Sequence, residues 1–180
     1  MSEAELYEPI QAYLQGAFPL VREGRWKINL RHAAITATLD WIDGGSWMRP
    51  DLALVHVHRR RFDPVPTLDL YTFEVKPSDA NALAGLHQTL AHGRFADFVS
   101  FVLPRVDRVA PELMAQAARF GVGLITFRSA GDFGSYVIHS APRKGTPDAD
   151  MREQFLNKAL DADASKEVLE WLGVSDEPQK

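Results

Sequence analysis

Glu74-Val75-Lys76 places a carboxylate and an amine close together at the end of an apolar run. Side chains alternate along an extended strand, so Glu74 and Lys76 share one face, about 6–7 Å apart, and Val75 faces the other way. A carboxylate binds a hard divalent cation well, and a neighbouring ammonium can hold a phosphate oxygen. The tripeptide is therefore a candidate for phosphodiester chemistry.

A second carboxylate, Asp51, stands at the start of another apolar run, and a proline-containing loop separates the two runs. Proline is disfavoured inside a strand, so we predict a hairpin that turns near Pro64. Paired positions would then sum to about 128, which puts Asp51 opposite the Lys76–Pro77 end. Asp51, Glu74 and the backbone carbonyl of Val75 would bind Mg²⁺, and Lys76 would orient or deprotonate a metal-bound water or hold a phosphate oxygen.

The elements that would carry these residues are indicated by hydrophobic periodicity, capping residues and glycine or proline at the boundaries. Hairpins come first and a crossover later, so we predict an α/β fold with a mixed central sheet and helices on both faces. The expected helices are Glu3–Gln15 (capped by Ser2), Ser78 or Asp79 to His92, Pro111–Phe120, Met151–Leu160 and Lys166–Leu172; the expected strands are Trp26–Leu30, Ala33–Leu39, Asp51–His58, Leu68–Lys76, Phe98–Leu103, Val122–Phe127 and Ser135–His139, with a turn at Asp43-Gly44-Gly45.

Composition excludes several classes of protein. With 180 residues, 46% of them hydrophobic and 24% charged, the chain is typical of a folded domain rather than of a disordered or coiled-coil protein. It has no cysteine, which excludes disulfides, zinc ribbons and thiol catalysis. No apolar run approaches the roughly 20 residues of a membrane helix, and the polar N-terminus is unlike a signal peptide, so we expect a cytoplasmic protein.

The net charge of −4 is unevenly distributed, because residues 1–145 carry +1 and residues 146–180 carry −5. Residues 146–180 also have the pattern of one or two short amphipathic helices followed by an acidic tail, so we divide the chain into a domain, residues 1–145, and a short helical appendage with an acidic tail, residues 146–180. This balance permits a nucleic-acid partner without requiring one.

Arg49-Pro50-Asp51, followed 23 residues later by Glu74-Val75-Lys76, resembles the PD-(D/E)XK nuclease superfamily. That superfamily has the restriction-endonuclease-like fold, whose αβββαβ core matches the expected order of elements. Glu3 is similar to a glutamate that many members carry in the first helix, and Gln88 to a glutamine in the helix after the ExK strand. His92 stands where some members have tyrosine.

The resemblance implies a Mg²⁺-dependent nuclease, with Mn²⁺ as a substitute, that cleaves nucleic acid, DNA rather than RNA, as an endonuclease and as a homodimer. It implies that Asp51, Glu74 and the Val75 carbonyl ligate the metal, that Lys76 acts on the attacking water, and that Glu3 completes the outer shell of the metal. Contacts to nucleic acid are expected from Gln88 and from Arg59, Arg60 and Arg61 near the hairpin tip.

Each candidate also has an ordinary structural explanation that the sequence leaves open. Asp51 could end a turn, Glu74 and Lys76 could form an exposed ion pair, and Glu3 could act only on the helix dipole. Gln88 could be a solvated amide, and His56 and His58 could either bind phosphate or lie on a solvated strand edge. The alternative functions are a non-cleaving nuclease-fold module that binds nucleic acid or a protein, and a partner-activated defence effector.

Overall fold

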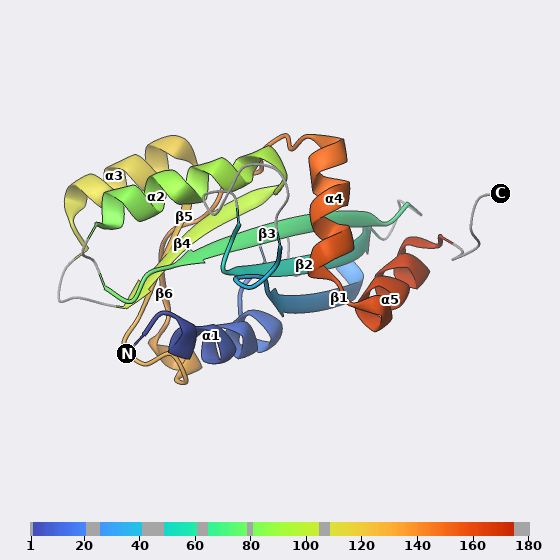
Figure 1. Ribbon diagram of the computed structural model, residues 1–180, viewed down its shortest axis with the longest axis horizontal. Helices are drawn as coiled ribbons and strands as arrows, with labels where there is room; N and C mark the ends of the chain where they lie inside the picture. Colours follow the sequence, from blue (N-terminus) through green and yellow to red (C-terminus); the bar gives the residue numbers. More distant parts are fainter. Residues whose placement is uncertain are drawn as a thin grey trace.

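The computed structural model describes residues 2–20, 26–40, 49–60, 65–78, 81–104 and 109–174 (Figure 1). The predicted turn at residues 43–45 lies outside these ranges. In chain order the elements are α1 (Ala4–Gly16), β1 (Trp26–Ile35), β2 (Leu52–Arg60), β3 (Thr67–Val75), α2 (Ala82–Ala91), a 3₁₀ turn (His92–Arg94), β4 (Phe98–Pro104), α3 (Pro111–Phe120), β5 (Gly123–Phe127), a second 3₁₀ turn (Phe133–Ser135), β6 (Val137–Ser140), α4 (Ala149–Ala159) and α5 (Ala162–Leu172).

A six-stranded mixed sheet with strand order β1-β2-β3-β4-β5-β6 forms the centre of the molecule. The pairs β1–β2, β2–β3 and β5–β6 are antiparallel, whereas β3–β4 and β4–β5 are parallel. The predicted α/β class and mixed sheet are confirmed. The prediction of two separate strands before residue 40 is wrong, because the pairing of β1 with β2 runs without interruption through Arg31 and His32.

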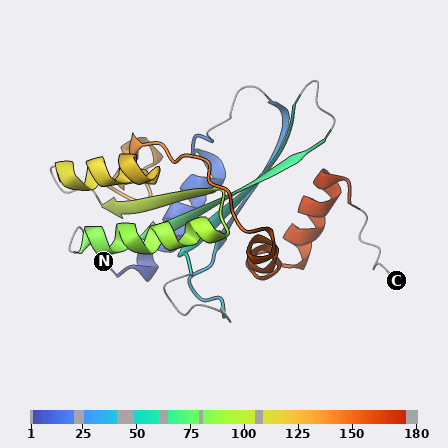
Figure 2. The ribbon, with the colours of Figure 1, turned by 90° about the horizontal axis from the view of Figure 1, so that it is seen from above.

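Helices cover both faces of the sheet, and each face has its own apolar core. On one face α1 packs its buried side chains against β2, β3, β4 and β5. On the other face α2 and α3 lie side by side (Figure 2), and buried side chains of α4 and α5 join the same cluster. Phe155 of α4, for example, stacks on Phe95 with ring centroids 4.7 Å apart.

The register of the β2–β3 hairpin differs from the prediction. Leu52 pairs with Phe73 and His58 with Thr67, so paired positions sum to 125 rather than to the expected 128. The register is set by the pairing of the two strands along their length, and the positions of Pro64 and Pro66 in the sequence do not define it. As a result, Asp51 lies beside Glu74 and Val75 instead of opposite Lys76–Pro77.

Two glutamines of α1 hold this helix against the open edge of β1. Gln11 donates a hydrogen bond to the Ala33 carbonyl, while Gln15 donates to the Arg31 carbonyl and accepts from the Ala33 amide. An edge strand presents unpaired backbone groups, so these side chains satisfy it and at the same time fix the position of α1. The first turn of α1 is thereby placed at the end of the sheet where β3 ends.

Several predicted boundaries shift by a few residues. Ser2 is not the N-cap of α1, which is Glu3, and the Ser2 amide instead donates to the Glu5 carboxylate. The helix after β3 begins at Ala82, following Asn81 in a left-handed conformation, rather than at Ser78; Asp79 lies outside the described residues. Within the described part of the chain, no helix has the length and apolar character needed to cross a membrane.

Candidate active site

The predicted site residues gather at the carboxyl end of β3, between the first turn of α1 and helix α2. Glu74 and Val75 are the last two residues of β3, and the Lys76 amide donates to the Val102 carbonyl of the parallel neighbour β4. Parallel strands need a crossover between them, so α2 must pass directly over this end of the sheet. The topology therefore concentrates side chains from α1, β3, α2 and the start of β2 at one place.

Asp51 is held in a defined orientation by both of its carboxylate oxygens. Oδ1 accepts a hydrogen bond from the Tyr7 hydroxyl (2.9 Å) and Oδ2 accepts one from the Val75 amide (2.7 Å). The amide and carbonyl of one residue point to the same side of an extended strand, so the Val75 carbonyl also lies on the Asp51 side of β3. Asp51 lies directly before β2, and its side chain is thereby fixed to the end of β3.

Glu74 is fully buried, with no exposed surface. Its Oε1 accepts a hydrogen bond from Lys76 Nζ at 2.6 Å, and the same Nζ lies 3.5 Å from Glu3 Oε2. Among the described residues, Glu74 Oε2 has no hydrogen-bond partner, and the nearby His92 Nε2 is 3.7 Å away. A buried carboxylate oxygen without a donor is costly unless a cation or a proton satisfies it.

The site destabilises the charged forms of both Asp51 and Glu74. Burial and the neighbouring charge of Asp51 raise the pKa of Glu74 to about 8, although the ion pair with Lys76 acts in the opposite direction. Burial also raises the pKa of Asp51 to about 6, against the hydrogen bonds from Val75 and Tyr7 that lower it. Clustered carboxylates with raised pKa values are a recurring property of functional sites, where a bound cation offsets their repulsion.

The pKa of Lys76 is raised above its ordinary value. Burial acts to lower the pKa, but the hydrogen bond and charge of Glu74, together with the charges of Asp51 and Glu3, outweigh that effect. Lys76 is therefore an ammonium ion at neutral pH, and with 23% of its side chain exposed it is accessible to solvent. This charge state favours binding of a phosphate oxygen over removal of a proton from water.

Tyr7 of α1 also belongs to the site, although it was not among the predicted site residues. Its hydroxyl lies 2.9 Å from both Glu3 Oε1 and Asp51 Oδ1. A phenol has one proton to donate, and the two carboxylates share it. The i, i+4 spacing of Glu3 and Tyr7 is the sequence signal that could have indicated their pairing.

His92 lies at the end of α2 and is fully buried beside Glu74. Burial and the charge of Lys76 lower its pKa to about 3, so the imidazole is neutral. Gly85 allows this close approach of α2, because a Cβ there would lie 2.7 Å from the Phe101 ring and 3.2 Å from Lys76 Cγ. Gln88 is half-buried one turn from both Gly85 and His92, on the side of α2 that faces the site.

The other predicted nucleic-acid contacts lie elsewhere or outside the described part of the molecule. Arg59 is exposed on β2, but eight residues along the strand from Asp51, or about 26 Å away. Neither the side chain of Arg60 nor Arg61 is among the described residues. His56 and His58 neither bind phosphate at the surface nor lie on a solvated edge, because both side chains are buried. Burial and the charge of His58 lower the pKa of His56 to about 4.

The assembled site contains two buried carboxylates, a backbone carbonyl on the same side and an ammonium that is accessible to solvent. Glu3 holds the ammonium from α1, and Tyr7 links Glu3 to Asp51. Such a set can bind a divalent cation through oxygen atoms and an anion through nitrogen. No protein-family model matches the chain, and no curated protein is significantly similar to it in sequence.

Proposed function

We propose that this protein is a Mg²⁺-dependent nuclease with a restriction-endonuclease-like core. The observation that carries the proposal is the convergence of Asp51, Glu74 and Lys76 at one end of the sheet, with a buried Glu74 oxygen that lacks a hydrogen-bond donor among the described residues. The order α1-β1-β2-β3-α2-β4 supports the αβββαβ core of the PD-(D/E)XK nuclease superfamily. Fold alone does not establish activity, so the proposal rests on the site.

The donor set fits a hard divalent cation. Asp51, Glu74 and the Val75 carbonyl would hold Mg²⁺, or Mn²⁺ in its place, through oxygen atoms alone. When bound, the ion supplies a Lewis acid that polarises a phosphoryl oxygen and makes a coordinated water more acidic. Its positive charge also offsets the burial and the repulsion that raise the pKa values of Asp51 and Glu74.

The side chains around the metal ligands have separate tasks. Lys76, as an accessible ammonium, binds a non-bridging phosphate oxygen and stabilises the negative charge that develops during hydrolysis. Tyr7 fixes the orientation of Asp51, and Glu3 keeps Lys76 at the edge of the site. His92 is a neutral, buried neighbour of Glu74, with its Nε2 3.7 Å from Glu74 Oε2.

The substrate that we propose is nucleic acid, DNA in preference to RNA, cleaved internally by a homodimer. Gln88, on the side of α2 that faces the site, is the proposed contact to the phosphate backbone. A second candidate function is a partner-activated form of the same enzyme. It is favoured by the complete burial of Glu74, since a substrate and its metal reach that carboxylate only if neighbouring groups move.

The test is cleavage of circular and linear DNA, single- and double-stranded, with Mg²⁺, Mn²⁺ or EDTA. We expect metal-dependent cutting of the circular form by the wild type, and its loss in Asp51→Asn, Glu74→Gln and Lys76→Ala. Matched controls are Glu8→Gln on the exposed side of α1 and Lys166→Met on the exposed side of α5. Full activity in all three site variants would refute the proposal, whereas metal binding without cleavage would favour the partner-activated form.

A further inference from the structure

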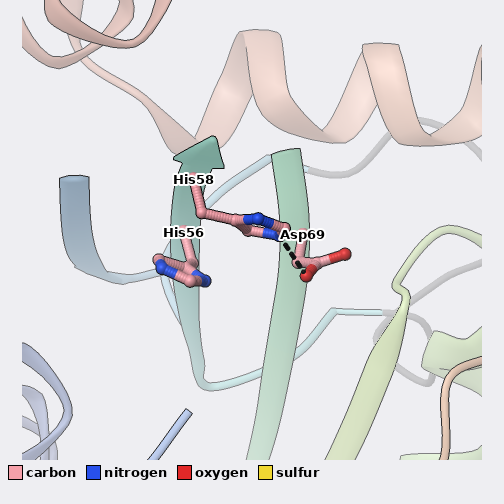
Figure 3. Close-up of side chains that lie close together, drawn as sticks. All are labelled: His56, His58 and Asp69. Carbon is pink, nitrogen blue, oxygen red and sulfur yellow. Dashed lines mark hydrogen bonds and ion pairs between the residues drawn. The ribbon is translucent and has the colours of Figure 1, made fainter. Parts of the chain in front are cut away.

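A second group of ligand-bearing side chains lies along the same hairpin, far from the candidate active site. Figure 3 shows its members. His56 and His58 alternate on β2, and Asp69 pairs directly with His56 on β3. One ring nitrogen from each histidine and one oxygen of Asp69 lie within 4.8 Å of one another, and all three side chains are buried. His56 is five residues from Asp51 along the strand, a separation of about 16 Å.

We propose that His56, His58 and Asp69 form a second metal site, specific for a transition-metal ion of the Zn²⁺ class. Two imidazole nitrogens and one carboxylate oxygen are ligands typical of Zn²⁺ and Co²⁺, whereas Mg²⁺ prefers oxygen alone. This inference does not depend on the proposed nuclease function, because the two sites share no residue and differ in donor chemistry.

The spacing of the three side chains is compatible with a tetrahedral ion. Ligand atoms about 2.1 Å from such an ion lie about 3.4 Å from one another. His58 Nε2 is already 2.9 Å from Asp69 Oδ2, and the two imidazole rings stack with centroids 4.8 Å apart. Figure 3 shows the His58 ring directed at Asp69 with His56 beside it, so a rotation of the His56 ring would close the set.

Charged neighbours orient the Asp69 carboxylate. Its Oδ1 accepts a hydrogen bond from Lys144 Nζ at 2.6 Å, which leaves Oδ2 directed at His58. Lys144 also lies 3.5 Å from Asp97, and Asp97 pairs with Arg152 at 2.9 Å. These contacts fix the orientation of the Asp69 carboxylate, with Oδ2 toward the histidines, but they also place an ammonium next to it.

The effect of replacing Lys144 can distinguish a metal site from a buried network of ion pairs. The carboxylates of Asp69 and Asp97 balance the positive charges of Lys144 and Arg152. A divalent ion bound to Asp69 would add positive charge to this balanced set, so it competes with Lys144 for the Asp69 carboxylate. Lys144 is 35% exposed and belongs to the segment between β6 and α4, outside any helix or strand, so its ammonium can move into water. Removing this ammonium should strengthen metal binding, because repulsion between two nearby cations is larger than the loss of one orienting hydrogen bond.

The experiment is a titration of the metal-free full chain with Co²⁺ in excess Mg²⁺, followed by the visible absorption of the bound ion. We expect one tetrahedral Co²⁺ per chain, binding that is about 100-fold weaker in His56→Gln and Asp69→Asn, and binding at least about tenfold tighter in Lys144→Met. His87→Gln, at an exposed position of α2, and Glu74→Gln, at the Mg²⁺ site, should bind Co²⁺ as the wild type does.

Because a buried substitution can unfold the chain, each variant is first compared with the wild type by circular dichroism, and Lys144→Met carries the test if the others fail to fold. Absence of tetrahedral Co²⁺ in the wild type would overturn the proposal. Weaker or unchanged binding in Lys144→Met would do the same, because an ion held by Asp69 must bind more tightly once the neighbouring ammonium is removed. Loss of binding in Glu74→Gln would overturn it as well, by assigning the ion to the other site.

Discussion

Replacing Glu74 with glutamine should stabilise the metal-free protein at alkaline pH while it removes Mg²⁺ binding. The Glu74 carboxylate is fully buried, and one of its oxygens has no hydrogen-bond donor among the described residues. The glutamine side chain would have nearly the same shape, would still accept a hydrogen bond from Lys76 and would carry no charge. The substitution therefore separates the stability cost of the site from its function.

The magnitude follows from the pKa of Glu74, which burial raises from 4.5 to about 8. Between these two pH values the folded state keeps a proton that the unfolded state has lost, so the stability of the wild type falls as the pH rises. At 1.36 kcal/mol for each pKa unit, the complete loss above pH 8 is about 5 kcal/mol at most. Since glutamine gives up the charged partner of Lys76, we expect Glu74→Gln to be about 2–5 kcal/mol more stable than the wild type at pH 8.5 and nearly equal to it at pH 4.5.

Urea unfolding of both proteins at several pH values, with and without Mg²⁺, tests this expectation. Mg²⁺ at about 100 times its Kd should restore about 3 kcal/mol to the wild type at pH 8.5 and nothing to the variant. Glu8→Gln, at an exposed position of α1, is the control and should follow the wild type. A stability difference that does not grow with pH, or Mg²⁺ stabilisation of Glu74→Gln, would refute the reasoning.

Three further substitutions address the residues that support the site. Tyr7→Phe removes a hydrogen bond that lowers the pKa of Asp51, so the onset of Mn²⁺ binding should move to higher pH. Calorimetry should show a larger loss of Mn²⁺ affinity at pH 6 than at pH 8. Equal losses of affinity would contradict this role of Tyr7. Gly85→Ala puts a Cβ 2.7 Å from the Phe101 ring. This clash should displace α2 and lower the free energy of unfolding by about 1–3 kcal/mol. An unchanged midpoint of urea unfolding would show that the contact is tolerated. Gln15→Ala leaves two backbone groups at the edge of β1 without their side-chain partner. Hydrogen exchange of the Ala33 amide should therefore accelerate by about tenfold, and the free energy of unfolding should fall by about 1 kcal/mol. Unaltered exchange would show that water replaces the glutamine at no cost.

Local sequence features predicted most of the elements. The boundaries of Pro111–Phe120 coincide with the observed helix, because proline suits its first position and Gly121 adopts the left-handed conformation that ends it. The alternation in Glu74-Val75-Lys76 correctly separated Val75, which lies in the core against α1, from Lys76, which packs near Gly85 of α2. These features depend on backbone geometry over a few residues, which is why one sequence suffices to predict them.

The tertiary structure alone decided the register of the hairpin and the membership of both candidate sites. Two prolines mark a loop but do not define its centre, so the position of Asp51 depended on how β2 and β3 pair along their full length. The Tyr7 hydroxyl reaches Asp51 only because glutamines on the same helix fix α1 to the edge of β1. The His56–His58 pattern had suggested a polar, accessible edge, but both histidines are buried, and His58 pairs with Asp69, which Lys144, far along the chain, also contacts. Long-range contacts set these features, since the free energy of a buried charge depends on partners that local sequence does not specify.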